Sequence, residues 1–186
     1  MHHIALIALG SNQPFGQTGP EAIVHSALTQ FHAFGLCVSR VSRFFVTPCF
    51  PAGAGPDFVN AAVAVRTGLD APGILKALHR IETDMGRNRP SRWAPRTLDL
   101  DLIAVGDLVL PDAAGHQQWR DLPPEHQASL APDQLILPHP RVQDRGFVLV
   151  PLADIAADWV HPVLGRSVAD MVAALPAKDR ADVRAL

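Results

Sequence analysis

The sequence predicts an α+β fold with a ferredoxin-like βαββαβ core, an antiparallel sheet with helices packed on it, an extra hairpin and C-terminal helices. The first observation behind this prediction is the order of hydrophobic periodicities, which runs strand, helix, strand, strand, helix, strand through the first hundred or so residues. The second is composition. Hydrophobic residues make up 48% of 186 residues, enough for one domain, 1–186, to bury its own core.

The first four elements follow from local pattern. A continuous apolar run from Ile4 to Leu9 is typical of a strand buried on both faces. Pro20 to Phe34 repeats apolar residues at helical spacing and is followed by Gly35, a common helix terminator. Alternating and β-branched residues predict two further strands, over Leu36–Val46 and Asp57–Arg66.

The second half continues the alternation of helix and strand. Asp70 is placed to cap a helix that has Pro72 in its first turn and runs to about Met85. A strand is predicted over 97–105, and Gly106-Asp107 then predicts a hairpin turn into Leu108–Leu110. Residues 111–134 are polar and proline-rich, which predicts a loop or excursion with no core of its own. Two shorter helices are expected in the tail, over 144–156 and 168–175.

Charge and cysteine content limit the class of partner. Sixteen basic residues against eighteen acidic ones give a formal net charge of −2, which argues against a nucleic-acid binder. Cys37 and Cys49 lack the spacing of a disulfide framework, as expected of reduced thiols in the cytoplasm. No secretory signal is recognisable, and no apolar run approaches the ~20 residues of a membrane span. We therefore expect a cytoplasmic protein that contacts no membrane, and we expect it to be a monomer.

Two aspartates mark the strand over 97–105. Leu98, Leu100 and Leu102 alternate with Asp99 and Asp101, so the leucines should face the core and both carboxylates the other side. At ~3.3 Å per residue the carboxylates stand about 6.6 Å apart. Their charges would repel by ~2–3 kcal/mol at an effective dielectric constant of about 20. Such a pair predicts a cation between the two side chains.

Two kinds of cation are available to this pair. Mg²⁺ prefers carboxylate and phosphate oxygens. Four arginines also precede the strand, in a stretch where Pro90 and Pro95 disfavour helix, and they are Arg87, Arg89, Arg92 and Arg96. One interpretation is a surface ion network between these arginines and the aspartates. The other is a clamp in which arginines and metal together hold a polyphosphate, and the local concentration of arginines favours it.

At these residues the chain resembles the 6-hydroxymethyl-7,8-dihydropterin pyrophosphokinase family. The stretch Ala94-Pro95-Arg96-Thr97-Leu98-Asp99-Leu100-Asp101-Leu102-Ile103 fits the family signature, with Ala94 where glycine is usual. The resemblance extends to three further stretches, 10–12, 57–62 and 137–147. It implies transfer of pyrophosphate from ATP to the hydroxymethyl group of 6-hydroxymethyl-7,8-dihydropterin, with release of AMP, in folate biosynthesis.

The resemblance also implies roles for individual residues. Asp99 and Asp101 would hold two Mg²⁺ ions, and Arg87, Arg92 and Arg96 would serve the transfer step together with them. Phe58 and Phe147 would stack on the two sides of the pterin ring, while the amide of Asn60 would read its edge and Trp93 would cover it as a lid. The residues implied to contact ATP are Glu82, Arg89, Arg92, Leu102, His139 and Arg145. Those implied to contact the pterin are Thr47, Pro48, Phe50, Phe58, Asn60, Trp93 and Phe147.

Two alternatives from other functional classes stay open. A two-metal phosphohydrolase or nuclease could use the same aspartate pair, although it would not need the pterin pocket. A non-catalytic pterin-binding relative would need neither the aspartates nor the arginines. Release of AMP from ATP and Mg²⁺, measured with and without the pterin, distinguishes all three.

Overall fold

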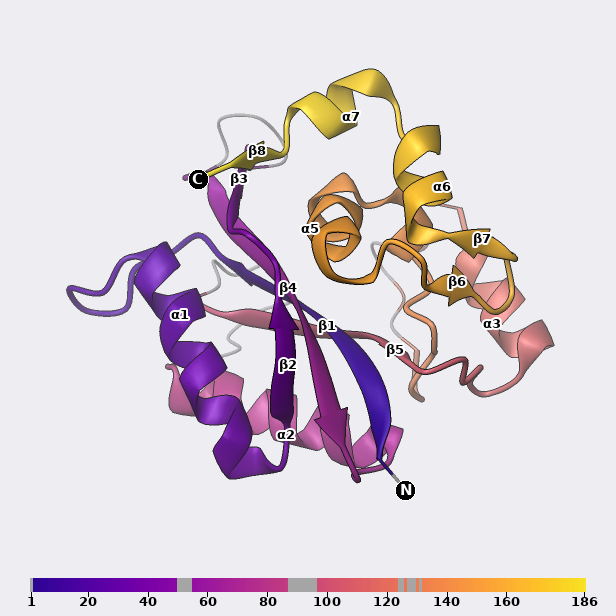
Figure 1. Ribbon diagram of the computed structural model, residues 1–186, viewed down its shortest axis with the longest axis horizontal. Helices are drawn as coiled ribbons and strands as arrows, with labels where there is room; N and C mark the ends of the chain where they lie inside the picture. Colours follow the sequence, from indigo (N-terminus) through magenta and orange to yellow (C-terminus); the bar gives the residue numbers. More distant parts are fainter. Residues whose placement is uncertain (1, 50–54, 87–96, 124–125, 127–129, 131) are drawn as a thin grey trace.

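The computed structural model describes residues 2–49, 55–86, 97–123, 126, 130 and 132–186. Its layers are a central antiparallel sheet with helices on both faces (Figure 1). The first half contains β1 (His3–Ser11), α1 (Pro20–Gln30), the 3₁₀ turn η1 (Phe31–Phe34), β2 (Cys37–Val41), β3 (Phe45–Thr47), β4 (Phe58–Thr67), α2 (Ala71–Asp84) and β5 (Asp99–Val105). The second half contains α3 (Ala113–Arg120), the 3₁₀ turn η2 (Val142–Asp144), α5 (Gly146–Ala156), β6 (Val160–His161), β7 (Arg166–Ser167), α6 (Val168–Ala174), α7 (Ala177–Ala181) and β8 (Arg184–Ala185).

The sheet has the strand order β5–β1–β4–β3–β8, and β2 pairs with β4 beside β3. Each of these pairings is antiparallel. If β2 and β3 are taken together as the second strand of the core, the order is that of a ferredoxin-like βαββαβ unit. The predicted fold class is therefore confirmed.

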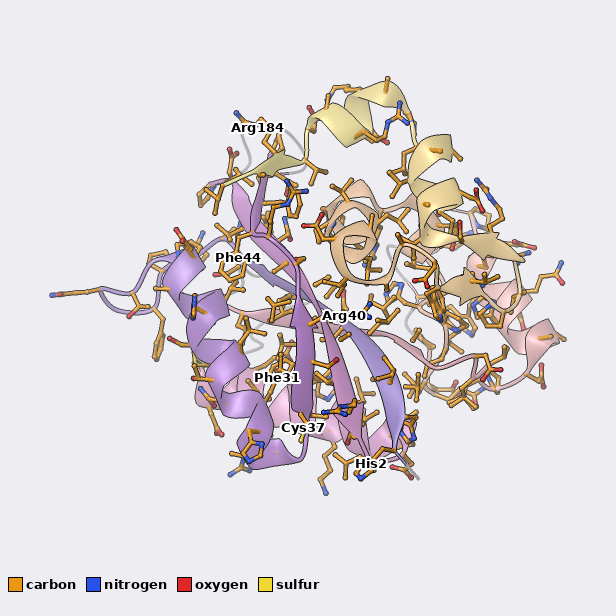
Figure 2. The ribbon with its side chains drawn as sticks, in the orientation of Figure 1. His2, Phe31, Cys37, Arg40, Phe44 and Arg184 are labelled. Carbon is orange, nitrogen blue, oxygen red and sulfur yellow. The ribbon has the colours of Figure 1, made fainter. Side chains whose placement is uncertain are left out.

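Each face of the sheet has its own hydrophobic core. Helices α1 and α2 cover one face, where Ile7, Phe31 and Leu78 are fully buried together. Helices α5 and α6 cover the other face, where Ile103 and Leu152 are buried (Figure 1). Figure 2 shows Phe31 at the end of α1, between that helix and the sheet. Because both faces of the sheet are buried, β1 and β4 consist almost entirely of consecutive apolar residues.

In the first half of the chain, the cap of α2 and the break between β2 and β3 each depend on a specific hydrogen bond. Asp70 caps α2 as predicted, because its Oδ1 accepts a hydrogen bond from the Gly73 N–H at 2.9 Å. The single strand predicted over 36–46 is divided into β2 and β3. At the break, the Ser42 hydroxyl accepts from the Ala62 N–H at 2.9 Å, so a side chain replaces one backbone partner.

The chain after β5 differs from the sequence prediction in two respects. Leu108–Leu110 does not return as a hairpin partner of β5. Leu110 instead forms an isolated bridge with Leu137, and the His139 N–H donates to the Ile103 carbonyl at 2.8 Å, which occupies the edge of β5. The stretch 111–134, expected to be a loop or excursion, contains α3 among its described residues, and the α3 residue His116 is fully buried.

The tail contains both predicted helices, as α5 and α6. The sequence analysis did not foresee the short hairpin of β6 and β7, helix α7 or the last strand, β8. Within the described residues, no helix is long and apolar enough to cross a membrane.

Candidate active site

One row of paired residues crosses three strands and organises the site. Gly10 of β1 pairs with Asn60 of β4 on one side and with Asp99 of β5 on the other. Two residues along β1, on the same face, Ala8 pairs with Asp101. Directly paired residues of antiparallel strands project from the same face, and Ala8 belongs to the core beneath α5 and α6. Asn60 and both aspartates therefore project from the α5 face of the sheet.

The aspartates lie as the alternation predicted. Leu98, Leu100 and Leu102 are buried in the core under α1 and α2, while both aspartates are partly exposed on the opposite face. The Leu102 side chain thus points away from the carboxylates, so only its backbone remains to make the predicted ATP contact.

Glu82 of α2 fixes the strand that carries the aspartates. Its side chain is only 2% exposed, and its Oε1 accepts a hydrogen bond from the Leu100 N–H at 2.8 Å. Leu100 lies between Asp99 and Asp101, so this bond joins α2 to the acidic segment of an edge strand. The predicted contact of Glu82 with ATP stays a prediction, whereas its bond to β5 is a positioning role that sequence reasoning did not foresee.

Arg145 faces the aspartates from the other side of the site. This residue immediately precedes α5, and its Nη1 lies 3.5 Å from Oδ2 of Asp101. Its guanidinium carbon also lies 5.7 Å from the centre of the Phe147 ring, within range of a cation–π contact. The Phe147 side chain is 41% exposed. Among the described residues, Asp101 therefore pairs with a cation from the start of α5, while the arginines that precede β5 in the sequence lie outside the described residues.

His139 lies beside this charged group. Its Nδ1 accepts a hydrogen bond from the Arg141 N–H at 3.1 Å, which places the ring proton on Nε2. Burial, together with the positive charges of Arg145 and Arg141, lowers the pKa of His139 to about 3, although Asp99 acts in the opposite sense. At neutral pH the ring is therefore an uncharged donor through Nε2.

The predicted pterin residues lie at the other end of the row. Thr47 pairs with Phe58 where β3 and β4 meet, and the Asn60 Nδ2 donates to the Thr47 hydroxyl at 2.8 Å. Asn60 and Thr47 are buried, Phe58 is partly exposed and Pro48 is exposed. A Cβ at Gly10 would lie 3.1 Å from Oδ1 of Asn60, so the glycine leaves room for this amide.

The structure thus brings together, around one face of the sheet, most of the described residues predicted from both halves of the chain; the exceptions are Glu82, which lies on α2, and the side chain of Leu102, which points into the core of the other face. Six predicted site residues lie outside the described residues, namely Phe50, Arg87, Arg89, Arg92, Trp93 and Arg96.

Two residues at the end of β1 received no role in the sequence analysis. Ser11 and Asn12 are buried, and the Ser11 Oγ and Asn12 Oδ1 have no hydrogen-bond partner among the described residues. They follow Gly10 directly in the chain, but Ser11 pairs with Val59, so its side chain projects from the α1 and α2 face, opposite Asn60 and Asp99. The motif Gly10-Ser11-Asn12, which contributed to the resemblance, was the signal that could have identified them.

A separate hollow lies between α1 and the sheet, lined by residues that include His25, Val59 and Leu186. Val59 packs against the core under α1 and α2, so this hollow lies on the face opposite the aspartates. It is not part of the candidate active site.

Comparison with known proteins gives a consistent result. Residues 6–157 match the model of the family described as 7,8-dihydro-6-hydroxymethylpterin-pyrophosphokinase (HPPK). The chain is 37% identical over 171 residues to a 2-amino-4-hydroxy-6-hydroxymethyldihydropteridine pyrophosphokinase of Synechocystis, covering 91% of this chain and 75% of the relative. It is 35% identical to the protein of the same name from Pseudomonas aeruginosa, covering 91% and 90%.

Among solved structures, a triple mutant of Plasmodium falciparum HPPK-DHPS matches with a TM-score of 0.66 and 15% identity, over 93% of this chain. This chain spans 44% of the length of that longer protein. At this level of identity the likeness concerns the fold alone.

Proposed function

The chain belongs to the 7,8-dihydro-6-hydroxymethylpterin-pyrophosphokinase family, and we propose that its active site is the α5 face of the sheet around Asp99 and Asp101. The chain is an ATP-dependent pyrophosphokinase of folate synthesis, which transfers pyrophosphate to the hydroxymethyl group of 6-hydroxymethyl-7,8-dihydropterin. ATP and the pterin are therefore its small-molecule substrates. The assignment of individual residues to this reaction is our proposal.

The observation that carries the proposal is the meeting of opposite charges on one face of the sheet. Asp99 and Asp101 project from β5 toward the start of α5, where Arg145 lies 3.5 Å from Asp101. Acidic groups can hold a metal ion that binds phosphate oxygens, and a guanidinium can grip such oxygens directly, so the two together suit a nucleoside triphosphate. The arrangement supports triphosphate binding between β5 and α5.

The aspartate pair fits magnesium by the chemistry of its donors. Both carboxylates are partly exposed hard oxygen ligands on the same face. Within the described ranges, no group of three or more His, Cys, Asp and Glu side chains could hold a metal. Mg²⁺ commonly uses one or two carboxylates and completes its octahedron with water and phosphate oxygens. When bound by Asp99 and Asp101, two Mg²⁺ ions would neutralise charge on the triphosphate.

The residues around the aspartates would bind and orient the triphosphate. Arg145 can direct its planar fork of N–H donors to phosphate oxygens. His139, neutral with its proton on Nε2, can donate one hydrogen bond without adding a positive charge. From the sequence alone, we assign Arg87, Arg92 and Arg96 to the charge that develops on the transferred group and on departing AMP.

The other end of the row would hold the pterin. Phe58 and Phe147 come from β4 and α5, and both are partly or largely exposed, as stacking on a flat ring requires. Asn60 offers a carbonyl oxygen and an amide to the ring edge, and its bond to Thr47 fixes its orientation. The hydroxymethyl oxygen would then attack the β-phosphorus, forming the new O–P bond as the bond from that phosphorus to the oxygen of AMP breaks.

A single assay tests the proposal. Purified protein with ATP and Mg²⁺ is expected to release AMP only when 6-hydroxymethyl-7,8-dihydropterin is present, in equal amount with the pterin diphosphate. Release of AMP or phosphate without the pterin would instead support a phosphohydrolase. Binding of the pterin with no AMP under either condition would support a non-catalytic relative.

A further inference from the structure

The C-terminal strand β8 adds to the sheet next to the pterin end of the candidate site. Phe45 pairs with Ala185 and Val46 with Arg184, and the Leu186 N–H donates to the Phe44 carbonyl at 2.9 Å. Figure 1 shows β8 lying along β3, with the C-terminus at that edge. Strand β3 has only three residues, and β8 makes it an interior strand with β4 on its other side.

The same strand also reaches β4 through a side chain. Arg184 Nη2 lies 3.8 Å from Oδ2 of Asp57, the residue that precedes Phe58. Figure 2 shows Arg184 at this edge of the sheet. Residues 184–186 therefore contact β3 up to Val46, the residue before Thr47, and Asp57, the residue just before β4. These strand ends carry Thr47 and Phe58.

Helix α7, which precedes β8, touches the opposite wall of the site. It packs against Gly146, the first residue of α5, so closely that a Cβ there would lie 2.9 Å from the Asp179 carbonyl oxygen. Gly146 lies between Arg145 and Phe147 in the chain. Residues 176–186 thus connect the first turn of α5 to the paired ends of β3 and β4.

We propose that residues 176–186 form a brace that positions the two walls of the pterin site relative to one another. Helix α7 holds the start of α5, which carries Phe147, while β8 holds the strand ends that carry Thr47 and Phe58. A stacking site depends on the separation of its two rings, so a brace between their elements sets how well a flat ligand fits. The family model matches only residues 6–157, so the brace lies beyond the matched region. This inference rests on the proposed function of the site.

If the brace positions the pterin site, its removal should change the KM for the pterin much more than the KM for ATP. Deletion of residues 183–186 is expected to raise the KM for the pterin about five- to tenfold, the effect of losing one or two backbone hydrogen bonds that hold the binding conformation. The KM for ATP should change by less than about twofold, because the deletion removes β8 and leaves α7 packed against Gly146, next to Arg145. A merely structural role would instead lower Tm and leave both KM values alike.

Point variants at Arg184 and Asp57 test the brace without removing any residue from the fold. Arg184→Glu places two negative charges together at Asp57 and is expected to raise the pterin KM about two- to fivefold, as for an exposed pair. The reciprocal variant, Arg184→Asp with Asp57→Arg, should restore most of this loss. Arg166→Ala is the matched control, since Arg166 is an exposed arginine of β7 in the same C-terminal region.

The outcomes separate the brace from the proposed function. If the unmodified protein shows no pterin-dependent AMP release, the proposed function fails. If it is active but the deletion and Arg184→Glu both keep the original pterin KM, the brace fails. If both KM values rise together with a fall in Tm, or the reciprocal variant does not recover, positioning of the pterin site by the brace is also refuted.

Discussion

Two buried histidines outside the active site make the fold sensitive to acid. His116 of α3 and His161 of β6 are fully buried, with ring centres 5.5 Å apart. His161 Nδ1 accepts hydrogen bonds from the N–H groups of Val163 and Leu164 at 3.2 and 3.3 Å, so its proton is on Nε2. His116 Nε2 donates to the Pro138 carbonyl at 2.9 Å, and burial lowers the pKa of His116, so the neutral ring carries its proton on Nε2. Both rings are therefore held in their neutral form.

The structure gives a magnitude for this sensitivity. Burial, together with the nearby His116 and Arg120, lowers the pKa of His161 to about 4. In the unfolded chain the pKa of histidine is about 6.5. The unfolded state thus takes up the proton first, so the stability from this residue is complete above about pH 6.5 and is lost as pH falls toward 4. At about 1.4 kcal/mol per pH unit, the difference amounts to ~3 kcal/mol.

The perturbation that isolates this effect is His161→Asn. The asparagine Oδ1 can accept from the same two N–H groups but cannot take up a proton. Urea unfolding followed by circular dichroism, repeated from pH 7 to pH 4.5, gives the free energy of unfolding at each pH. We expect the unmodified protein to lose ~2–3 kcal/mol more than the variant across this range. The exposed His32→Asn serves as the control and should follow the unmodified protein.

The reasoning would be refuted if the unmodified protein and His161→Asn lost stability in parallel between pH 7 and pH 4.5. Parallel curves would mean that the unfolded chain gains no advantage from protonating His161. The close contact of this ring with His116 would then stabilise the fold without any dependence on its charge.

Three further predictions concern the active site and its support. Asp99→Ala and Asp101→Ala should each abolish turnover while leaving Tm nearly unchanged, because both carboxylates are partly exposed; normal turnover in a folded variant would contradict the metal role. Arg96→Ala should slow the single-turnover rate more than it weakens pterin binding, and an unchanged rate with poor binding would oppose this assignment. Glu82→Ala should cost ~1–3 kcal/mol in urea unfolding, since the Leu100 N–H would lose its partner; a loss under about 0.5 kcal/mol would contradict this.

The core of the fold could be predicted because its signals are local. The leucines at 98, 100 and 102 and the aspartates between them assign a strand and its two faces without knowledge of the rest of the chain. The cap of α2 is likewise encoded within four residues. The pairing of Arg145 with Asp101 could not be predicted in this way, because Arg145 is brought to β5 by the packing of α5 across the sheet.

The elements that sequence reasoning missed depend on distant partners. Strand β8 has two residues, too few to show a period, and exists because it pairs with β3 some 140 residues earlier in the chain. Helix α3 shows little apolar face, since its one buried residue is His116. The break between β2 and β3 depends on the Ser42 hydroxyl and a backbone N–H of β4. Each of these features requires the tertiary arrangement to be known first.

The border of the sheet at β5 has a consequence for how the protein behaves in concentrated solution. Outer strands tend to recruit backbone from a neighbouring molecule and so start aggregation. Here the Leu100 N–H is taken by Glu82 and the Ile103 carbonyl by His139. These two groups are not open to a second copy. At these two positions the strand that bears the acidic pair is protected from pairing with a second copy, while the monomer expected from the sequence stays a prediction.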